Sequence, residues 1–324
     1  MSFFSAIRLC LQAFAQNNPN HRFDANETAW TERQATQIRS KLLEVVYPEF
    51  KALSLVPLAT DIAAEPGPYV YNVLDMVGEA RVIASGADDL PRVDVSVSER
   101  SGKVVPIGAS YGWDVFELRK AARLQVPLQE TKGRAARRAI AQQVDRMIAN
   151  GTTDGQTGLG LEGFINNADV IALGIAALTN WVQGTTTATT MIGELNAMVN
   201  TIVAATREAW IPDTLVLPTP RYVIFASTPY GVDADTTALT WFLKNNPYIK
   251  NVTSWQTLTG AGASSKDRCV VYKRSPDVLE AVAPELFAQE APQARNLDMV
   301  TPCYGLVGGT KIYHPEAVRY GDFG

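Results

Sequence analysis

Residues 67–113 read GPYVYNVLDMVGEARVIASGADDLPRVDVSVSERSGKVVPIGASYGW and predict a long two-armed β-ribbon. β-Branched residues recur through both arms, as Val70, Val73, Val82 and Ile83 in the first and Val93, Val95, Val97, Val104 and Val105 in the second. The run GADDLP at residues 86–91 separates the arms, because glycine, aspartate and proline favour turns. Each arm holds roughly 12–15 residues, so at about 3.3 Å per residue the ribbon reaches roughly 40–50 Å.

A ribbon of two strands and this length does not stabilise itself in water. The sequence around it offers little that resembles a dedicated local cover. We therefore expect a neighbouring copy of the chain to supply the cover, and the ribbon is a first indication of an assembly protein rather than an enzyme.

A long helix is predicted over residues 131–150, TKGRAARRAIAQQVDRMIAN, with Gly151 ending it. Its apolar stripe consists of Ala136, Ile140, Val144, Met147 and Ile148. Twenty residues rise about 30 Å, a length suited to a strut. The arginines off this stripe are Arg134, Arg137, Arg138 and Arg146. They form either a solvated face or a contact with an acidic partner or neighbouring subunit.

The composition excludes several classes of protein. The chain has 324 residues, 46% of them hydrophobic, and a formal net charge of −4, which argues against a dedicated nucleic-acid binder. An acidic shell could still enclose nucleic acid without binding it specifically. Three cysteines, Cys10, Cys269 and Cys303, show no paired spacing, as expected for buried thiols in a reducing cytosol. No apolar run is long enough for a membrane span, and Arg8 interrupts the N-terminal apolar run, so a cytoplasmic protein without a signal peptide is predicted.

The rest of the chain divides into an arm and an α/β part. The arm, residues 1–65, carries predicted helices at 3–15 and 27–46 and a short extended segment at 53–62. A short helix is predicted at 113–124, with Val115, Leu118 and Ala122 inward, and a second long helix at 189–210, ended by Pro212. Strands are expected at 214–217, 221–226, 251–255, 269–273 and 278–282, and a helix at 236–246 with Leu239, Phe242 and Leu243 inward. Two or three strands follow within 296–323, with Gly308-Gly309 as the turn.

No residue pattern predicts catalysis, a cofactor or a metal. Gly158–Gly163 matches the dinucleotide pattern G-x-G-x-x-G, but a helix ends just before it, so a structural turn is favoured. An enzyme of two α/β units using this loop is the remote alternative. His21 and His314 have no metal-ligand spacing. Asp88, Asp89 and Asp94 lack the cadence of a calcium loop, and salt bridges across a subunit contact are favoured.

The order of these elements resembles the major capsid proteins of tailed bacteriophages. Their architecture, the Johnson fold, also forms encapsulin shells and the capsid floor of herpesviruses. Local similarity to a bacterial and prophage family lies at 87–94 (ADDLPRVD), 111–119, 135–140 (AARRAI), 160–167 (GLEGFINN) and Gly308-Gly309. The resemblance covers most of the chain from about Asp61.

The resemblance implies an α+β fold with an N-terminal arm, an extended β-hairpin loop, a peripheral domain with a spine helix and an α/β axial domain. The implied boundaries are 1–65 for the arm, 66–107 for the loop, 108–212 for the peripheral domain, 213–300 for the axial domain and 301–324 for C-terminal strands returning to the peripheral domain. The implied function is a structural subunit of an icosahedral capsid, assembling as hexamers and pentamers around DNA. The alternative of the same fold is an encapsulin-like compartment shell.

Charged residues of the loop and spine helix are the candidate assembly contacts: Arg81, Asp88, Asp89, Arg92, Asp94, Arg100, Lys103, Arg134 and Arg138. Scaffolding, portal and decoration proteins are the expected partners, with assembly in the host cytoplasm and the virion capsid as the final location. The short arm favours a separate scaffolding protein. Some relatives join a loop lysine to an asparagine, but no matching asparagine or catalytic acid accompanies Lys103, the only lysine within 66–107, so no covalent cross-link is expected.

Overall fold

The computed structural model describes residues 49–78, 92–124, 128–152, 160–231 and 236–324, which belong to one compact unit beginning at Glu49. The predicted helices at 3–15 and 27–46 and the predicted turn at 86–91 lie outside the described residues. Helices and strands are interleaved along the unit, so the predicted α+β class is confirmed.

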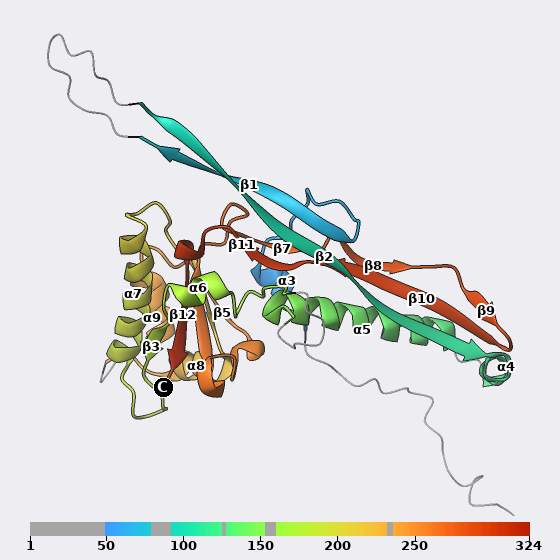
Figure 1. Cartoon of the computed structure of the whole chain (residues 1–324). Coiled ribbons are helices and arrows are strands. Elements are labelled where there is room, and N and C mark those ends of the chain that lie inside the picture. Colours follow the sequence, from blue (N-terminus) through green and yellow to red (C-terminus); the bar gives the residue numbers. More distant parts are fainter. Residues whose placement is uncertain (1–48, 79–91, 125–127, 153–159, 232–235) are drawn as a thin grey trace, which may run out of the picture. The chain divides into compact units, whose positions relative to one another are not determined.

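The predicted ribbon forms from β1 (Gly67–Val77) and β2 (Asp94–Asp114), which pair antiparallel. Figure 1 shows the two strands side by side. Their register runs from Gly67 opposite Val104 to Val77 opposite Asp94. Beyond Val104, β2 continues and pairs instead with β10 (Asp298–Val307). The expectation that the chain offers no local cover is therefore wrong for Val105–Asp114, whereas the remainder of β2 pairs with β1 alone among the described strands.

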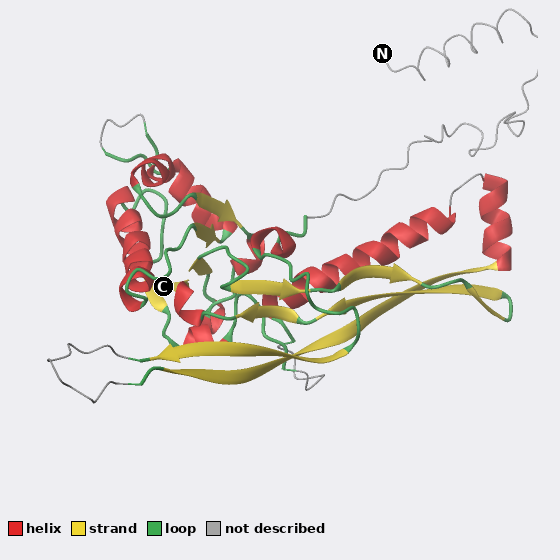
Figure 2. Ribbon diagram, turned by 90° about the horizontal axis from the view of Figure 1, so that it is seen from above, coloured by secondary structure: helices red, strands yellow, loops and turns green. Residues whose placement is uncertain are grey.

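The sheet is completed by β8 (Glu285–Gln289) and β9 (Gln293–Arg295), both on the other side of β10. Helix α5 (Leu128–Asn150) runs alongside β2 and β10 (Figure 2). It starts at Leu128 rather than Thr131, and it ends at the predicted residue because Gly151 adopts a left-handed φ of 65°. The whole predicted apolar stripe of this helix is buried.

The short helix after β2, α4, spans Val115–Leu124, so Trp113 belongs to the strand and not to the helix as predicted. Leu118 was expected to point inward, but 39% of it is exposed. Lys132 connects α5 to this region, since its Nζ lies 2.7 Å from Glu117 Oε2 and donates to the Gly112 carbonyl at 2.8 Å.

A strap of residues 50–59 crosses the unit. Residues 53–62 were predicted to be extended, but Ala52–Leu55 forms the short helix α3, and Leu58 then bridges to Ala281. The Ala59 N–H donates to the Ala281 carbonyl at 3.0 Å, and Tyr272 Oη donates to the Leu55 carbonyl at 2.7 Å. Leu55 is buried. This segment therefore packs into the body of the unit.

A second sheet has the order β3-β12-β6-β4-β5, and β7 and β11 form a separate two-stranded sheet. Their bounds are β3 Ala176–Leu178, β4 Thr214–Leu217, β5 Asn251–Ser254, β6 Arg268–Tyr272, β7 Leu279–Val282, β11 Gly309–Ile312 and β12 Val318–Phe323. The helices are α6 Ala168–Ala172, α7 Ala188–Ala205, α8 Thr219–Ser227 and α9 Ala238–Asn245, with 3₁₀ turns at Gln256–Leu258, Ala263–Ser265 and Pro315–Ala317.

Alternate residues of this sheet enter two hydrophobic cores. Val270 and Tyr272 pack in the core that contains α5 and the strap, whereas Cys269 and Val271 pack in the core that contains α7, α8 and α9. Strands buried on both faces are apolar at nearly every position, so β4 and β6 are continuous runs of mostly apolar residues in the sequence. Both strands were predicted from these runs.

Three local predictions in this part are wrong. Residues 221–226 lie in helix α8 rather than in a strand, because Pro220 in the first turn favours helix initiation. Helix α7 ends at Ala205 and not near Trp210, since Arg207 and Glu208 have left-handed φ angles of 50° and 66°. On α9, Leu243 is exposed rather than inward.

The chain changes sheets at Gly308-Gly309. This pair was predicted as a hairpin turn, but it connects β10 to β11, which belong to different sheets. Helix α7 packs in one core with β4 and β6, and β12 pairs with β6. The predicted domain boundaries stay predictions. The peripheral and axial roles themselves stay predictions.

Candidate assembly surfaces

One face of the ribbon is apolar and exposed. Residues opposite each other in an antiparallel pair lie on the same face, so Leu74 shares a face with Val97, and Met76 with Val95. The exposed fraction is 64% for Leu74, 80% for Met76 and 59% for Val97. Val70 and Val93 continue this apolar strip, which hereafter means Val70, Leu74, Met76, Val93, Val95 and Val97. The polar pair Asn72–Glu99 separates Val70 from the other members of the strip, and an exposed apolar strip of this kind marks an interaction surface.

The opposite face of the ribbon is more polar and is fastened at its root. Tyr71 lies opposite Arg100, and its ring meets Tyr313 edge-on at a centroid distance of 5.1 Å. Tyr69 lies over Gly102, where a Cβ would overlap the ring. Burial, reinforced by Tyr71 and nearby carboxylates, raises the pKa of Tyr69 to about 12. The root of the ribbon is therefore fixed, and the apolar strip beyond it is presented in one direction.

The charged residues predicted from the sequence do not gather on one face. Arg81, Asp88 and Asp89 lie outside the described residues. Asp94 and Arg100 share the face opposite the apolar strip, since both occupy even positions of β2, whereas Lys103 lies on the strip's own face.

Three further predicted contact residues lie at the start of β2 and on the spine helix. Arg92 is exposed just before β2. On α5, Arg134 is exposed, and Arg138 lies 5.7 Å from the centre of the Phe50 ring. Arg134 and Arg138 are four residues apart and so neighbour each other along the helix.

Sequence reasoning missed the apolar strip. It named the valines of both arms, but it attributed the contact to charges. The available signal was the alternation of Val93, Val95 and Val97 with polar residues in the second arm, together with Leu74 and Met76 two residues apart in the first. Only the register shows that these two sets share a face.

A second exposed apolar surface lies where β2 meets α4. Phe116 and Leu118 of α4 are exposed, as is Leu297, whose carbonyl accepts the Val115 N–H at 3.1 Å. The Arg119 guanidinium lies 5.9 Å from the centre of the Phe116 ring. This surface, called the α4 patch, lies at the opposite end of β2 from the apolar strip (Figure 1).

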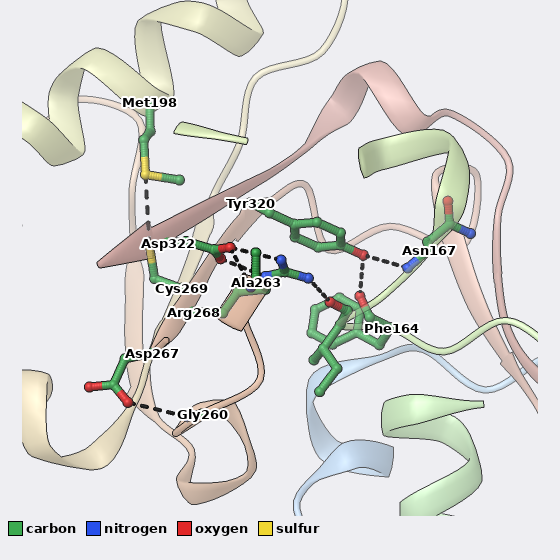
Figure 3. Close-up of polar contacts among 11 residues, drawn as sticks. Phe164, Asn167, Met198, Gly260, Ala263, Asp267, Arg268, Cys269, Tyr320 and Asp322 are labelled. Atoms are coloured by element: carbon green, nitrogen blue, oxygen red, sulfur yellow. Dashed lines mark hydrogen bonds and ion pairs between the residues drawn. The ribbon is translucent and has the colours of Figure 1, made fainter. Parts of the chain in front are cut away.

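A buried polar network connects the loop after α5 to the second sheet (Figure 3). Arg268 forms a two-pronged ion pair with Asp322, and its third nitrogen donates to the Ile165 carbonyl. Tyr320 Oη donates to the Phe164 carbonyl at 2.6 Å and accepts the Asn167 N–H at 3.3 Å. Burial raises the pKa of the Tyr320 hydroxyl, so Tyr320 stays a neutral donor. The network holds structure together and presents no open site.

The glycine-rich loop serves close packing in its described part. Phe164 and Ile165 donate to the carbonyls of Ile148 and Ala149, so the chain turns back along the end of α5. A Cβ on Gly163 would overlap the main chain there. No helix begins within residues 160–167, as a dinucleotide site would require, since α6 starts at Ala168.

The described residues show no alternative chemical centre. No cluster of three metal-ligating side chains occurs among them. His314 Nδ1 lies 3.0 Å from Glu316 Oε1, and His21 is outside the described part. Burial raises the pKa of the Cys269 thiol, which leaves it an unreactive core group. No helix in the described ranges is long and apolar enough to cross a bilayer.

Comparison with known proteins now gives the class. The sequence matches the family described as major capsid protein over residues 78–323. None of the curated proteins matches the chain. The structure is similar to the capsid of Myoviridae phage XM1, with a TM-score of 0.77 and 15% identity over 91% of this chain and 98% of that chain. It is similar to a Mycobacterium phage Adephagia structure, with a TM-score of 0.64 and 14% identity over 93% and 98% of the two chains.

A virus-like particle from Pyrococcus furiosus is less similar, with a TM-score of 0.48 and 10% identity over 83% of this chain and 90% of that chain. The two phage likenesses show the fold. The family match covers more than half of the sequence, and the chain belongs to the major capsid protein family. It is a structural subunit of a phage capsid, as the sequence predicted.

Proposed function

We propose that the subunit assembles into hexamers and pentamers of a closed shell by laying its ribbon on a neighbouring copy, with the apolar strip as the contact. The observation that carries this proposal is the exposure of Leu74, Met76 and Val97 on one face of the ribbon. Burying a side chain of this size contributes about 1.5–3 kcal/mol. Burial of the strip against another copy would therefore contribute a large favourable free energy of association, because the strip is exposed to solvent in the isolated subunit.

The α4 patch is the surface on which we place the apolar strip of the adjacent copy. The two surfaces differ and lie at opposite ends of β2, so their contact is head-to-tail. Head-to-tail contacts close into rings when the rotation between copies permits it. Phe116 is the aromatic anchor of the patch, and anchors of this type dominate interface energetics.

Charged residues would steer and orient this contact rather than supply most of its affinity. The proposed set is unchanged: Arg81, Asp88, Asp89, Arg92, Asp94, Arg100, Lys103, Arg134 and Arg138. With a net charge of −4, the shell encloses DNA without binding it specifically. The same proposal includes scaffolding, portal and decoration proteins as partners and assembly in the host cytoplasm. It also includes the peripheral and axial roles of the two domains, and a subunit without catalysis or covalent cross-links.

Two pairs of substitutions test the contact. Leu74→Glu with Val97→Glu places two charges on the apolar strip, whereas Val73→Glu with Ser98→Glu places two on the opposite face at the adjacent register pair. Both double variants should keep the circular dichroism spectrum of the wild type. Electron microscopy and analytical ultracentrifugation should show shells or rings for the wild type and the second variant only. Normal shells from the first variant would reject the apolar strip as the contact.

A further inference from the structure

A hollow unrelated to the ribbon lies between α7 and α9. Its volume is about 230 Å³, and side-chain amides and aromatic rings line it: Asn196, Asn200, Trp241, Asn245, Asn246 and Tyr248. We call it the amide groove. Asn196 and Asn200 occupy neighbouring turns of α7, and Asn245 ends α9. The groove belongs to neither the apolar strip nor the α4 patch.

The hydrogen bonds of the groove leave several polar atoms available. Asn246 is held on both sides, since its Nδ2 donates to Asn196 Oδ1 at 2.9 Å and its Oδ1 accepts the N–H groups of Tyr248 and Ile249. Asn245 Nδ2 donates to the Trp241 carbonyl at 2.9 Å. Among the described residues, Asn196 Nδ2, Asn245 Oδ1 and the Asn200 amide make no other hydrogen bond. The groove therefore offers donors and acceptors together.

The groove carries no charge. None of its lining residues has a formally charged side chain. A charged ligand would lose hydration there without gaining a counter-charge, so the chemistry favours an uncharged ligand with amide groups. Trp241 forms a flat wall that is already held in place, because it stacks on Tyr230 with a centroid distance of 4.4 Å and an interplanar angle of 16°. Preorganisation of this kind lowers the entropic cost of binding.

The groove continues along α7. At Asn200 it adjoins a second hollow of about 470 Å³ that Val203 and Ala204 also line, with the charged Arg207 and Glu208 beyond them, so the uncharged part runs from Asn196 to Ala204. From Asn196 to Ala204 the helix rises about 12 Å at 1.5 Å per residue, which matches roughly four residues of extended chain. This length exceeds a single sugar ring and suits a peptide. Arg207 and Glu208 lie at the far end in the left-handed conformation.

We propose that the amide groove binds an extended, uncharged and amide-rich peptide segment of a partner protein. The segment would run along α7, exchange hydrogen bonds with Asn196, Asn200 and Asn245, and place an apolar side chain against Trp241. This function goes beyond the contact between shell subunits, and neither depends on the other.

The test uses the full chain and a fluorescein-labelled peptide, Asn-Ala-Asn-Ala-Asn with its carboxyl end amidated, followed by fluorescence anisotropy. Saturable binding is expected, with Kd raised at least about fivefold by Asn200→Ala and by Asn245→Ala. Asn251→Ala is the matched control, because Asn251 is an exposed asparagine of β5 that does not line the groove, and its Kd should equal that of the wild type. The analogue Asp-Ala-Asp-Ala-Asp should not bind.

Three results would overturn the proposal: no binding of the neutral peptide, equal binding of the aspartate analogue, or an unchanged Kd in both groove variants. Displacement of the labelled peptide by glucose at comparable concentration would reassign the groove to a carbohydrate. Circular dichroism of each variant separates loss of binding from loss of fold. Shell formation by the same samples in electron microscopy reports on the proposed function separately.

Discussion

Arg268 and Asp322 form a two-pronged buried ion pair, with Nε to Oδ1 at 2.7 Å and Nη2 to Oδ2 at 2.9 Å. The two residues lie opposite each other on β6 and β12. Arg268 also donates to the Ile165 carbonyl, and Asp322 accepts the Ala263 N–H. One ion pair thus joins two strands and two loops that are distant in the sequence.

Asp322→Asn should lower the free energy of unfolding by about 3–5 kcal/mol, because it leaves the Arg268 charge buried without a partner. Urea denaturation followed by circular dichroism measures this. Glu117→Gln is the comparison, since the Glu117–Lys132 pair is partly exposed and should contribute at most about 1 kcal/mol. Equal midpoints for the two variants would contradict the importance of burial.

Gly163→Ala should destabilise the subunit by about 1–3 kcal/mol, because the added Cβ overlaps the main chain of Ala149 and Asn150. Gly193→Ala is the matched control. Gly193 lies within α7, and nothing is within 4 Å of the Cβ position, so alanine should stabilise the helix by about 0.5–1 kcal/mol. Thermal unfolding should therefore shift in opposite directions for the two alanines. A shift in the same direction would contradict the close packing of the loop.

Ile140→Asp should prevent folding, because Ile140 is buried in the apolar stripe of α5 and its methyl groups lie against Gly305 of β10. An unpaired carboxylate there loses its hydration without a partner. Loss of the cooperative unfolding transition and of soluble protein is the expected result. Ala139→Asp, one position along on the exposed face, should fold normally. Cooperative unfolding of Ile140→Asp would show that α5 does not need this contact.

The sequence predicted those elements whose signal is local. Gly151 and the apolar stripe gave the end and the buried face of α5, and β-branched residues around a turn-forming run gave the ribbon. The pairing of β2 with β10 was invisible, because Ser110 and Pro302 are brought together only by the fold. Residues 221–226 were predicted as a strand but form part of α8, because strand propensity depends on the context of the residues.

The candidate surface shows the same division. Charges on β2 and α5 could be named directly, but the apolar strip depends on a register that places Leu74 beside Val97. A shift of one residue would move every side chain to the other face. The exposure of Phe116 was equally hidden, because it depends on which side of α4 meets the sheet.

Asp145→Asn should remove part of the pH dependence of stability. Burial raises the pKa of Asp145 above its ordinary value, despite the hydrogen bond that its Oδ1 accepts from the Ala52 N–H at 2.8 Å. Because the native pKa is raised, the stability that the protonated Asp145 carboxyl contributes is complete below the unfolded pKa. It is lost as pH rises through the native pKa. The asparagine oxygen still accepts the bond. The variant should therefore gain stability relative to the wild type as pH rises above about 3.9, the ordinary pKa of an aspartate.

Urea denaturation of both proteins at several pH values measures that gain. Glu99→Gln makes the same change from carboxyl to amide at an exposed position within β2, serves as the control and should not show this gain. If Asp145→Asn also tracks the wild type across this range, the carboxyl is not the source of the pH dependence.

Arg92→Glu should leave the subunit folded and impair its assembly. Arg92 is exposed at the start of β2, next to Val93 of the apolar strip, so reversing its charge changes the free energy of unfolding by no more than about 0.5 kcal/mol. At a contact between copies, the same reversal replaces attraction by repulsion and slows association.

Lys266→Glu makes an equal change of charge in an exposed loop elsewhere and is the control. Ultracentrifugation at low and high salt should show fewer shells for Arg92→Glu only, with partial recovery at high salt because screening weakens the repulsion. Normal shells at low salt would remove Arg92 from the contact and leave the apolar strip to act without it.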